Sequence, residues 1–245
     1  MSSAALSLLL LSSSRVADGA YLQTSRSLLA SHFSHCQRIL FIPFAGVQQS
    51  SRAYGAEVIA ALPELAGRIA VLQADDDGSE QLAACDGVMV GGGNTFVLLD
   101  RLYRHGLVRE LRDAVRAGLP YAGWSAGSNI AAPSIRTTND MPVIEPPSLA
   151  ALNLVPFQIN PHYHNLAMPG FHGETRRERL AEFMAMNPDC PVMALPEGCG
   201  LQINAEQLTV VGDCPALRLV ADGQDQPLPP GSCVHLDSFA TSQPA

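Results

Sequence analysis

The sequence predicts an α/β fold in which a mostly parallel sheet is flanked by helices and followed by C-terminal β-hairpins. Short apolar runs of strand length alternate with stretches of helical spacing along most of the chain. Glycine-rich segments directly follow two of these apolar runs, where ligands bind in parallel sheets. From about Gly200 onward, short apolar segments separated by turn residues indicate hairpins.

Each predicted element has a local reason. Apolar runs predict buried strands at residues 4–11, 38–44, 68–73, 87–90, 119–122 and 190–195. Apolar residues spaced three and four apart predict helices at 54–66, 95–102 and 107–117, and a further helix starts within 174–179. The hairpin segments are 201–203, 208–211, 217–220 and 233–236, with a proline-rich turn at 224–231. Residues 12–14, three serines, are interpreted as the turn after the first strand.

The length and composition are typical of one large globular domain. The chain has 245 residues, of which 47% are hydrophobic and 16% charged. We expect a single domain over residues 1–240 and a frayed tail at 241–245. The net charge of −8 argues against partners that require a basic face, so we expect neither nucleic acid nor a membrane as partner.

The cysteines and the N-terminal segment bear on location. The six cysteines form no Cys-x-x-Cys pair and several lie in predicted core segments, which favours reduced thiols in a cytoplasmic protein. The apolar run near the N-terminus is short and no basic segment precedes it, so we expect a first strand and not a signal peptide. No apolar stretch reaches the length of a transmembrane span.

Residues 123–127 have the form Gly-x-Ser-x-Gly directly after an apolar strand. In α/β proteins this pattern builds a sharp turn from a strand into a helix and leaves the serine hydroxyl exposed. The amides at the helix start then face any negative charge that develops nearby, as acyl transfer requires. The same pattern also occurs as a plain strand-to-helix turn, so Ser125 is a candidate nucleophile.

A second glycine cluster, Gly91-Gly92-Gly93-Asn94, follows the strand predicted at 87–90. Its uncovered amides suit either a phosphate or an oxyanion, or the cluster is a turn with a steric role only. Phe96 breaks a dinucleotide fingerprint, and all 15 basic residues are arginines, so a P-loop, a Schiff base and pyridoxal phosphate are excluded. We expect no cofactor.

A serine nucleophile needs a histidine base. His162, His164 and His172 cluster in the segment 160–165 and the loop beyond. Three histidines at this spacing also suit zinc, although no cysteine or carboxylate completes a metal site at the usual spacing.

These motifs together resemble the peptidase E family, the α-aspartyl dipeptidases. The matches run in order from about residue 8 to beyond residue 200. They comprise residues 41–47 (FIPFAGV), 91–96 (GGGNTF), 123–127 (GWSAG), 135–142 (IRTTNDMP), 158–162 (QINPH) and 173–176 (GETR). The resemblance implies a serine peptidase on the class I glutamine-amidotransferase-like fold that hydrolyses dipeptides with an N-terminal aspartate.

The resemblance also implies roles for individual residues. Ser125 is the nucleophile and His162, in the matched Asn-Pro-His, is the base. Two carboxylates compete to orient that base, Glu197 and Asp140. Glu197 is favoured because it is held at a rigid strand end between Pro196 and Gly198.

Further matched positions concern the substrate. The amides of Gly92, Gly93 and Ala126 would form the oxyanion hole, with Asn94 beside them. Arg176, in the matched Gly-Glu-Thr-Arg, would bind the β-carboxylate of the substrate, and Arg136 is the second candidate.

The expected partner is thus a small Asp-Xaa peptide. The sequence also leaves open whether the protein forms a homodimer. Two other functions remain as alternatives: a cyanophycinase-like or other serine hydrolase on the same fold, and a non-catalytic binding module.

Overall fold

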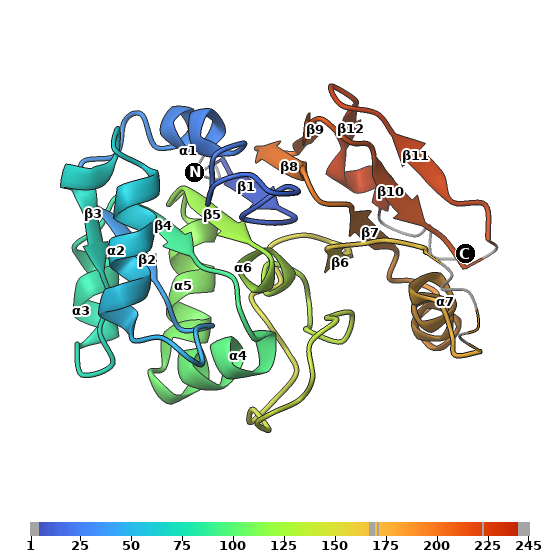
Figure 1. Cartoon of the computed structure of the whole chain (residues 1–245), viewed down its shortest axis with the longest axis horizontal. Coiled ribbons are helices and arrows are strands. Elements are labelled where there is room, and N and C mark those ends of the chain that lie inside the picture. Colours follow the sequence, from blue (N-terminus) through green and yellow to red (C-terminus); the bar gives the residue numbers. More distant parts are fainter. Residues whose placement is uncertain (1–4, 167–169, 171, 222, 240–245) are drawn as a thin grey trace.

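An eight-stranded sheet runs through the centre of the molecule (Figure 1). The structure is a computed structural model and describes residues 5–166, 170, 172–221 and 223–239. The strands are β1 (Ser7–Leu11), β2 (Ile39–Ile42), β3 (Ile69–Val71), β4 (Gly87–Val90), β5 (Tyr121–Trp124), β8 (Cys199–Asn204), β9 (Gln207–Gly212) and β12 (Cys233–His235). Their order is β12-β9-β8-β1-β5-β4-β2-β3. Strands β1, β5, β4, β2 and β3 are parallel to one another, as predicted. Strands β8, β9 and β12 each pair antiparallel with their neighbours.

A second sheet of four strands lies beside the first (Figure 1). It consists of β6 (Gln158–Pro161), β7 (Val192–Leu195), β10 (Ala216–Leu219) and β11 (Gln226–Leu228), in the order β11-β10-β7-β6. The prediction of a turn over residues 224–231 is wrong for residues 226–228, which form the strand β11. This strand is at the edge and pairs only with β10, and an edge strand accommodates Pro227 because a missing amide can face away from the partner.

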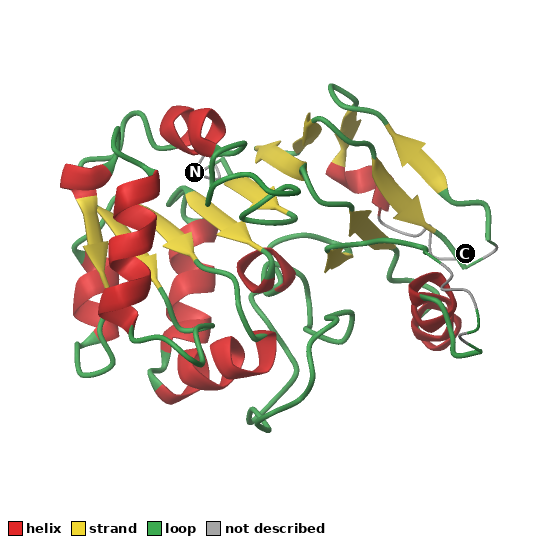
Figure 2. Cartoon of the chain, in the orientation of Figure 1, coloured by secondary structure: helices red, strands yellow, loops and turns green. Residues whose placement is uncertain are grey.

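Helices cover both faces of the parallel strands (Figure 2). They are α1 (Arg26–His32), α2 (Ser51–Ala61), α3 (Gly78–Ala83), α4 (Thr95–Arg104), α5 (Leu107–Arg116), α6 (Ala126–Asn129) and α7 (Arg176–Met186), with 3-10 turns η1 (Ala66–Arg68) and η2 (Leu236–Phe239). In β1, Leu8 and Leu10 pack in one buried cluster with α4 and α5, whereas Leu9 and Leu11 pack in another with α1 and α2. Both faces are therefore buried, which explains why the strands are apolar throughout.

The helix predicted at 54–66 has different ends in the structure. It begins at Ser51 because the Ser50 hydroxyl accepts a hydrogen bond from the Ala53 amide and caps the first turn. It ends at Ala61, two residues before Pro63, which lacks the amide that a helix interior needs. Two short helices, α1 and α3, and the strand β6 were not predicted.

The carboxyl ends of β1, β4 and β5 meet at one edge of the sheet, because these strands are parallel neighbours or next neighbours. At this edge β1 is followed by Ser12, β4 by the glycine cluster at 91–93, and β5 by the Ser125 turn. No helix in the described residues is long and apolar enough to cross a membrane. The predicted tail at 241–245 lies outside the described residues.

Candidate active site

Ser125 occupies the sharp turn between β5 and α6. Its backbone has φ 53° and ψ −114°, a conformation that is rare for a residue with a side chain. The flanking glycines are required by close packing: a Cβ at Gly127 would lie 2.2 Å from the carbonyl oxygen of Val90, and one at Gly123 would lie 2.4 Å from that of Gly127. The turn holds the hydroxyl of Ser125 toward a cavity of about 630 Å³ that it lines with His162.

Ser125, His162 and Glu197 form a row. Nε2 of His162 lies 3.0 Å from Oγ of Ser125, and its Nδ1 lies 3.0 Å from Oε1 of Glu197. When Nδ1 carries the proton and donates it to Glu197, Nε2 is left to accept the serine proton. The row therefore has the geometry that general-base activation of a serine requires.

The end of β1, at Leu11 and Ser12, is hydrogen-bonded to the residues that follow or end β5, β6 and β7. The amide of Ser125 donates to the carbonyl of Leu11 (3.1 Å), and the amide of His162 donates to Oγ of Ser12 (2.9 Å). The Ser12 hydroxyl in turn donates to the carbonyl of Leu195 at the end of β7 (2.7 Å). Ser12 is fully buried. The sequence indicates only a turn at Ser12, since none of the neighbouring residues predicts hydrogen-bond partners so distant along the chain.

The backbone of Gly92 lies against the serine, and Gly93 lines the same cavity. A Cβ at Gly92 would lie 2.9 Å from Cβ of Ser125, and one at Gly93, where φ is 137°, would lie 2.3 Å from the carbonyl oxygen of Ala45. Among the hydrogen bonds of the described residues, none is donated by the amides of these two glycines. The amide of Ala126, at the first position of α6, also has no acceptor within its helix. The amides of Gly92, Gly93 and Ala126 thus have no hydrogen-bond acceptor among the described residues.

Asn94 and Asp140 organise the loop that carries these glycines. The Asn94 side chain accepts from the amide of Val97 and so caps α4, and it donates to the carbonyl of Met141 (2.9 Å). Oδ2 of Asp140 accepts from the amide (2.7 Å) and the hydroxyl (2.6 Å) of Thr95. Among the described contacts of Asp140, none is to His162, so the structure places Glu197, and not Asp140, beside the imidazole.

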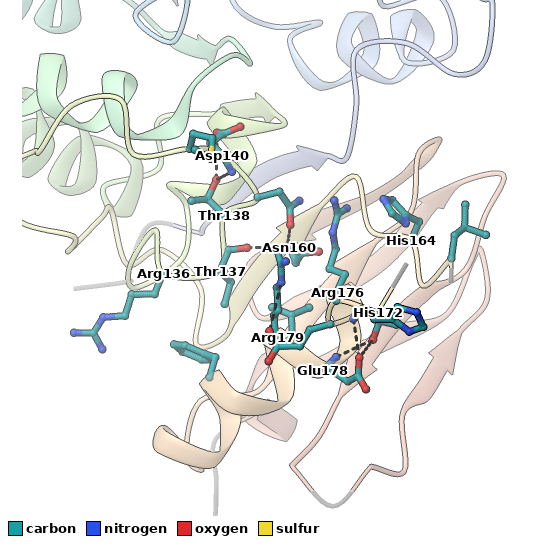
Figure 3. Close-up of a pocket in the computed structure, with 18 residues that line it drawn as sticks. Arg136, Thr137, Thr138, Asp140, Asn160, His164, His172, Arg176, Glu178 and Arg179 are labelled. Carbon is teal, nitrogen blue, oxygen red and sulfur yellow. Dashed lines mark hydrogen bonds and ion pairs between the residues drawn. The ribbon is translucent and has the colours of Figure 1, made fainter. Parts of the chain in front are cut away.

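Arg176 lines a neighbouring cavity of about 650 Å³ (Figure 3). Its guanidinium donates to the backbone carbonyl of His162, whose side chain lies in the Ser125 cavity. Burial lowers the pKa of Arg176, and the positive charge of Arg179 adds to this effect. Within the described residues no carboxylate forms an ion pair with Arg176, so its charge is available to an anion.

Three other candidate residues, Arg136, His164 and His172, line this second cavity but are more exposed than Arg176. Arg136 lines it but is exposed and points in a different direction from Arg176 (Figure 3). His164 and His172 line it too and are exposed. Among the described residues, no three His, Cys, Asp or Glu side chains gather in a metal-binding arrangement.

Fold and site together define a class of protein. A serine on a strained strand-to-helix turn, bonded to a histidine at the carboxyl edge of a parallel sheet, is typical of the α/β hydrolytic enzymes. Comparison with known families refines this class: the model of Peptidase family S51 matches residues 8–211. The chain belongs to this family, and the protein is a peptidase.

Individual relatives agree with this assignment. The chain is 47% identical to Peptidase E of Shewanella sp. (strain ANA-3) over 224 residues, which cover 91% of this chain and 95% of the relative. It is 45% identical to Peptidase E of Shewanella denitrificans over 228 residues, 93% of this chain and 97% of the relative. The resemblance to peptidase E is therefore confirmed.

Solved structures show the same fold. A peptidase from an acI-B1 Actinobacterium superimposes with a TM-score of 0.64 at 17% identity, covering 95% of this chain and 98% of that one. A protein from Listeria monocytogenes EGD-e superimposes with a TM-score of 0.65 at 25% identity, covering 85% and 99%.

Proposed function

We propose that this peptidase is a serine dipeptidase that hydrolyses dipeptides with an N-terminal aspartate through an acyl-enzyme. One observation carries the proposal: Nε2 of His162 lies 3.0 Å from Oγ of Ser125 while its Nδ1 lies 3.0 Å from Glu197. The similarity to proteins named Peptidase E supports it.

In the first half of the reaction Oγ of Ser125 attacks the peptide carbonyl carbon and its proton passes to Nε2 of His162. Glu197 holds the imidazole in the required tautomer and stabilises the imidazolium that forms. The carbonyl oxygen becomes an oxyanion, which accepts hydrogen bonds from the free amides beside the serine. When the tetrahedral intermediate collapses, the C–N bond breaks and His162 gives its proton to the leaving amine.

In the second half a water molecule attacks the ester carbonyl of the acyl-enzyme. His162 takes a proton from the water as it attacks, and returns it to Oγ of Ser125 as the ester bond breaks. The products are free aspartate and the second amino acid. The same amides serve both halves because both pass through a tetrahedral oxyanion.

Arg176 supplies the selectivity for aspartate in this proposal. Its guanidinium is partly buried, has no ion-pair partner among the described residues and is bonded to the backbone of the proposed base. The aspartate β-carboxylate is separated from the scissile carbonyl by only two carbon atoms, so it must be bound close to that base. Arginine suits the task because its planar fork binds both oxygens of a carboxylate.

A dipeptide panel with an arginine variant tests this selectivity. We expect Asp-Leu to be cleaved and Asn-Leu and Glu-Leu to be cleaved about 10²-fold less efficiently, because Asn leaves the partly buried arginine without a counter-charge and Glu places its carboxylate one methylene further from the scissile carbonyl. Arg176→Met should lower kcat/KM for Asp-Leu by about 10²-fold and alter hydrolysis of a small neutral ester far less. Arg136→Met, which removes an exposed arginine of the same cavity, is the matched control and should stay within about twofold.

Parallel loss of peptide and ester hydrolysis in Arg176→Met would show that this arginine supports the structure around His162. In that outcome the carboxylate site lies elsewhere, and a large effect of Arg136→Met would identify it.

Two conservative substitutions test whether Glu197 or Asp140 orients the imidazole of His162. Glu197→Gln should lower kcat by about 10²-fold, because the imidazolium loses its counter-charge and the imidazole its orientation. The effect is smaller than for a buried acid since 53% of the Glu197 side chain is exposed. Asp140→Asn should lower the melting temperature through the loss of hydrogen bonds to Thr95, with kcat reduced less than about tenfold. The reverse order of kcat values would make Asp140 the acid that acts on His162.

We also propose a cytoplasmic location. All six cysteines are free in the structure, and Cys36 and Cys199 are buried, which is the state expected in a reducing compartment.

A further inference from the structure

Three aromatic side chains form a hydrogen-bonded cluster beside the glycine loop: Tyr21, Tyr54 and Trp124. Tyr54 lies on α2, Trp124 ends β5, and Tyr21 precedes α1. The Tyr54 hydroxyl lies 3.0 Å from the carbonyl oxygen of Gly92. It also lies 3.2 Å from the Tyr21 hydroxyl and 3.2 Å from the indole Nε1 of Trp124, which is 3.1 Å from the Tyr21 oxygen.

Hydrogen-bonding capacity determines the direction of every bond in this cluster. The Gly92 carbonyl only accepts, so the single proton of the Tyr54 hydroxyl is donated to it. The indole of Trp124 only donates, so both tyrosine oxygens accept from it. The Tyr21 hydroxyl must then donate to Tyr54. The Tyr54 oxygen thus accepts two hydrogen bonds while it donates one, an arrangement that polarises its O–H group toward Gly92.

The ionisation state of the tyrosines supports these directions. Burial raises the pKa of Tyr54 above its usual value, and burial together with the neighbouring Tyr54 raises the pKa of Tyr21. Both hydroxyls therefore keep their protons over the pH range in which a histidine base works.

The bond to Gly92 has a consequence for the next amide. The peptide unit that joins Gly92 to Gly93 is planar and trans, so its C=O and N–H groups point in opposite directions. A donor that holds the Gly92 carbonyl therefore also aims the amide of Gly93. Glycine itself does not restrict this peptide, because it allows a wide range of backbone angles, and φ at Gly93 is 137°. The same hydroxyl packs closely on Gly91, where a Cβ would lie 2.6 Å from it.

We propose that Tyr54 is a positioning residue for the oxyanion hole: its hydroxyl holds the Gly92–Gly93 peptide so that the Gly93 amide stays aimed at the oxyanion. Tyr21 acts through Tyr54, whereas Trp124 donates to both tyrosines and also packs against Gly92. The inference rests on the proposed serine mechanism and assigns a role in it to side chains that have no described hydrogen bond to the side chain of Ser125, although Tyr21 and Tyr54 line the same cavity.

The test uses a fluorophosphonate probe beside the peptide substrate. Oγ of Ser125 attacks phosphorus, the P–F bond breaks, fluoride leaves and the serine proton passes to His162. The phosphoryl oxygen then lies where the peptide oxyanion would lie. Labelling therefore reports on the oxyanion hole without any need for an aspartate in the ligand.

Tyr54→Phe keeps the ring that packs on Phe41 and removes only the hydroxyl. We expect the rate constant of labelling and kcat for Asp-Leu to fall together by about tenfold, with KM within about twofold, because a misaimed amide weakens transition-state binding more than ground-state binding. Tyr103→Phe is the matched control: Tyr103 also donates to a backbone carbonyl, that of Ala150, but far from the glycine loop. It should leave both rates within about twofold.

A double-mutant cycle separates positioning from general support of the structure. Tyr21→Phe alone should lower both rates by about twofold to threefold, because Tyr54 loses one of two donors. Tyr21→Phe added to Tyr54→Phe should lower them no further, since Tyr21 has no other route to Gly92. A loss that multiplies in the double variant would overturn the relay from Tyr21.

The outcomes keep the two proposals distinguishable. A folded Tyr54→Phe protein that is labelled at the wild-type rate overturns the positioning role. Wild-type protein that is labelled at Ser125 but does not cleave Asp-Leu overturns the proposed substrate, while labelling still decides the role of Tyr54. Wild-type protein that is not labelled overturns the serine mechanism and this inference with it.

Discussion

Ser125→Ala is expected to abolish peptide hydrolysis, with kcat lowered by about 10³-fold or more. The substitution removes the attacking oxygen and leaves the turn intact, because alanine keeps the Cβ that serine already places at φ 53°. The measurements are kcat and KM for Asp-Leu, with the melting temperature as a check of the fold. Since the Ser125 side chain has His162 as its described hydrogen-bond partner, we expect the melting temperature to change little.

Ser148→Ala is the control for this experiment. Ser148 is exposed and its hydroxyl accepts from the amide of Ala150, so kcat should stay within about twofold. Near-normal turnover by purified, folded Ser125→Ala protein would rule out the serine mechanism.

His162→Ala is expected to match the loss caused by Ser125→Ala, because without the imidazole the serine has no acceptor for its proton. His164→Ala is the paired variant and should keep kcat within about threefold, since His164 is exposed and lines the neighbouring cavity instead. Both variants are compared by kcat on Asp-Leu and by the rate of fluorophosphonate labelling.

Equal losses in the two histidine variants would contradict a single general base. That result would point to an ion shared by both imidazoles, and loss of wild-type activity on addition of a chelator would then support it.

The parallel core could be predicted well because its signals are local. Strands buried on both faces must be apolar along their whole length, so residues 38–44 and 87–90 contain the observed strands β2 and β4. Short elements with few buried side chains carry no comparable signal. In α1, for example, Leu29 is the buried residue, and this helix was missed. The edge strand β11 was missed because a proline normally marks a turn, and only its position at the sheet edge makes Pro227 acceptable.

The sequence by itself determined the fold class, the family and the strained serine turn. Each of these is indicated by residues close together in the chain, such as the glycines on both sides of Ser125. The clash that requires glycine at position 127, however, is with Val90 of the neighbouring strand, so the reason for that glycine is tertiary. The choice between Glu197 and Asp140 was different: the strand end between Pro196 and Gly198 favoured Glu197, but the sequence left Asp140 as a second candidate because it does not show which carboxylate lies near the histidine.

Only the tertiary structure placed Glu197 at His162 and Asp140 at Thr95. These contacts join residues that are 35 and 45 positions apart in the chain. Ser12, which lies between the amide of His162 and the carbonyl of Leu195, and Tyr54, which reaches Gly92 from α2, have partners that only the folded chain brings within hydrogen-bond distance. A hydrogen bond acts over about 3 Å, so its partners are decided by the packing of the elements and not by the order of the residues.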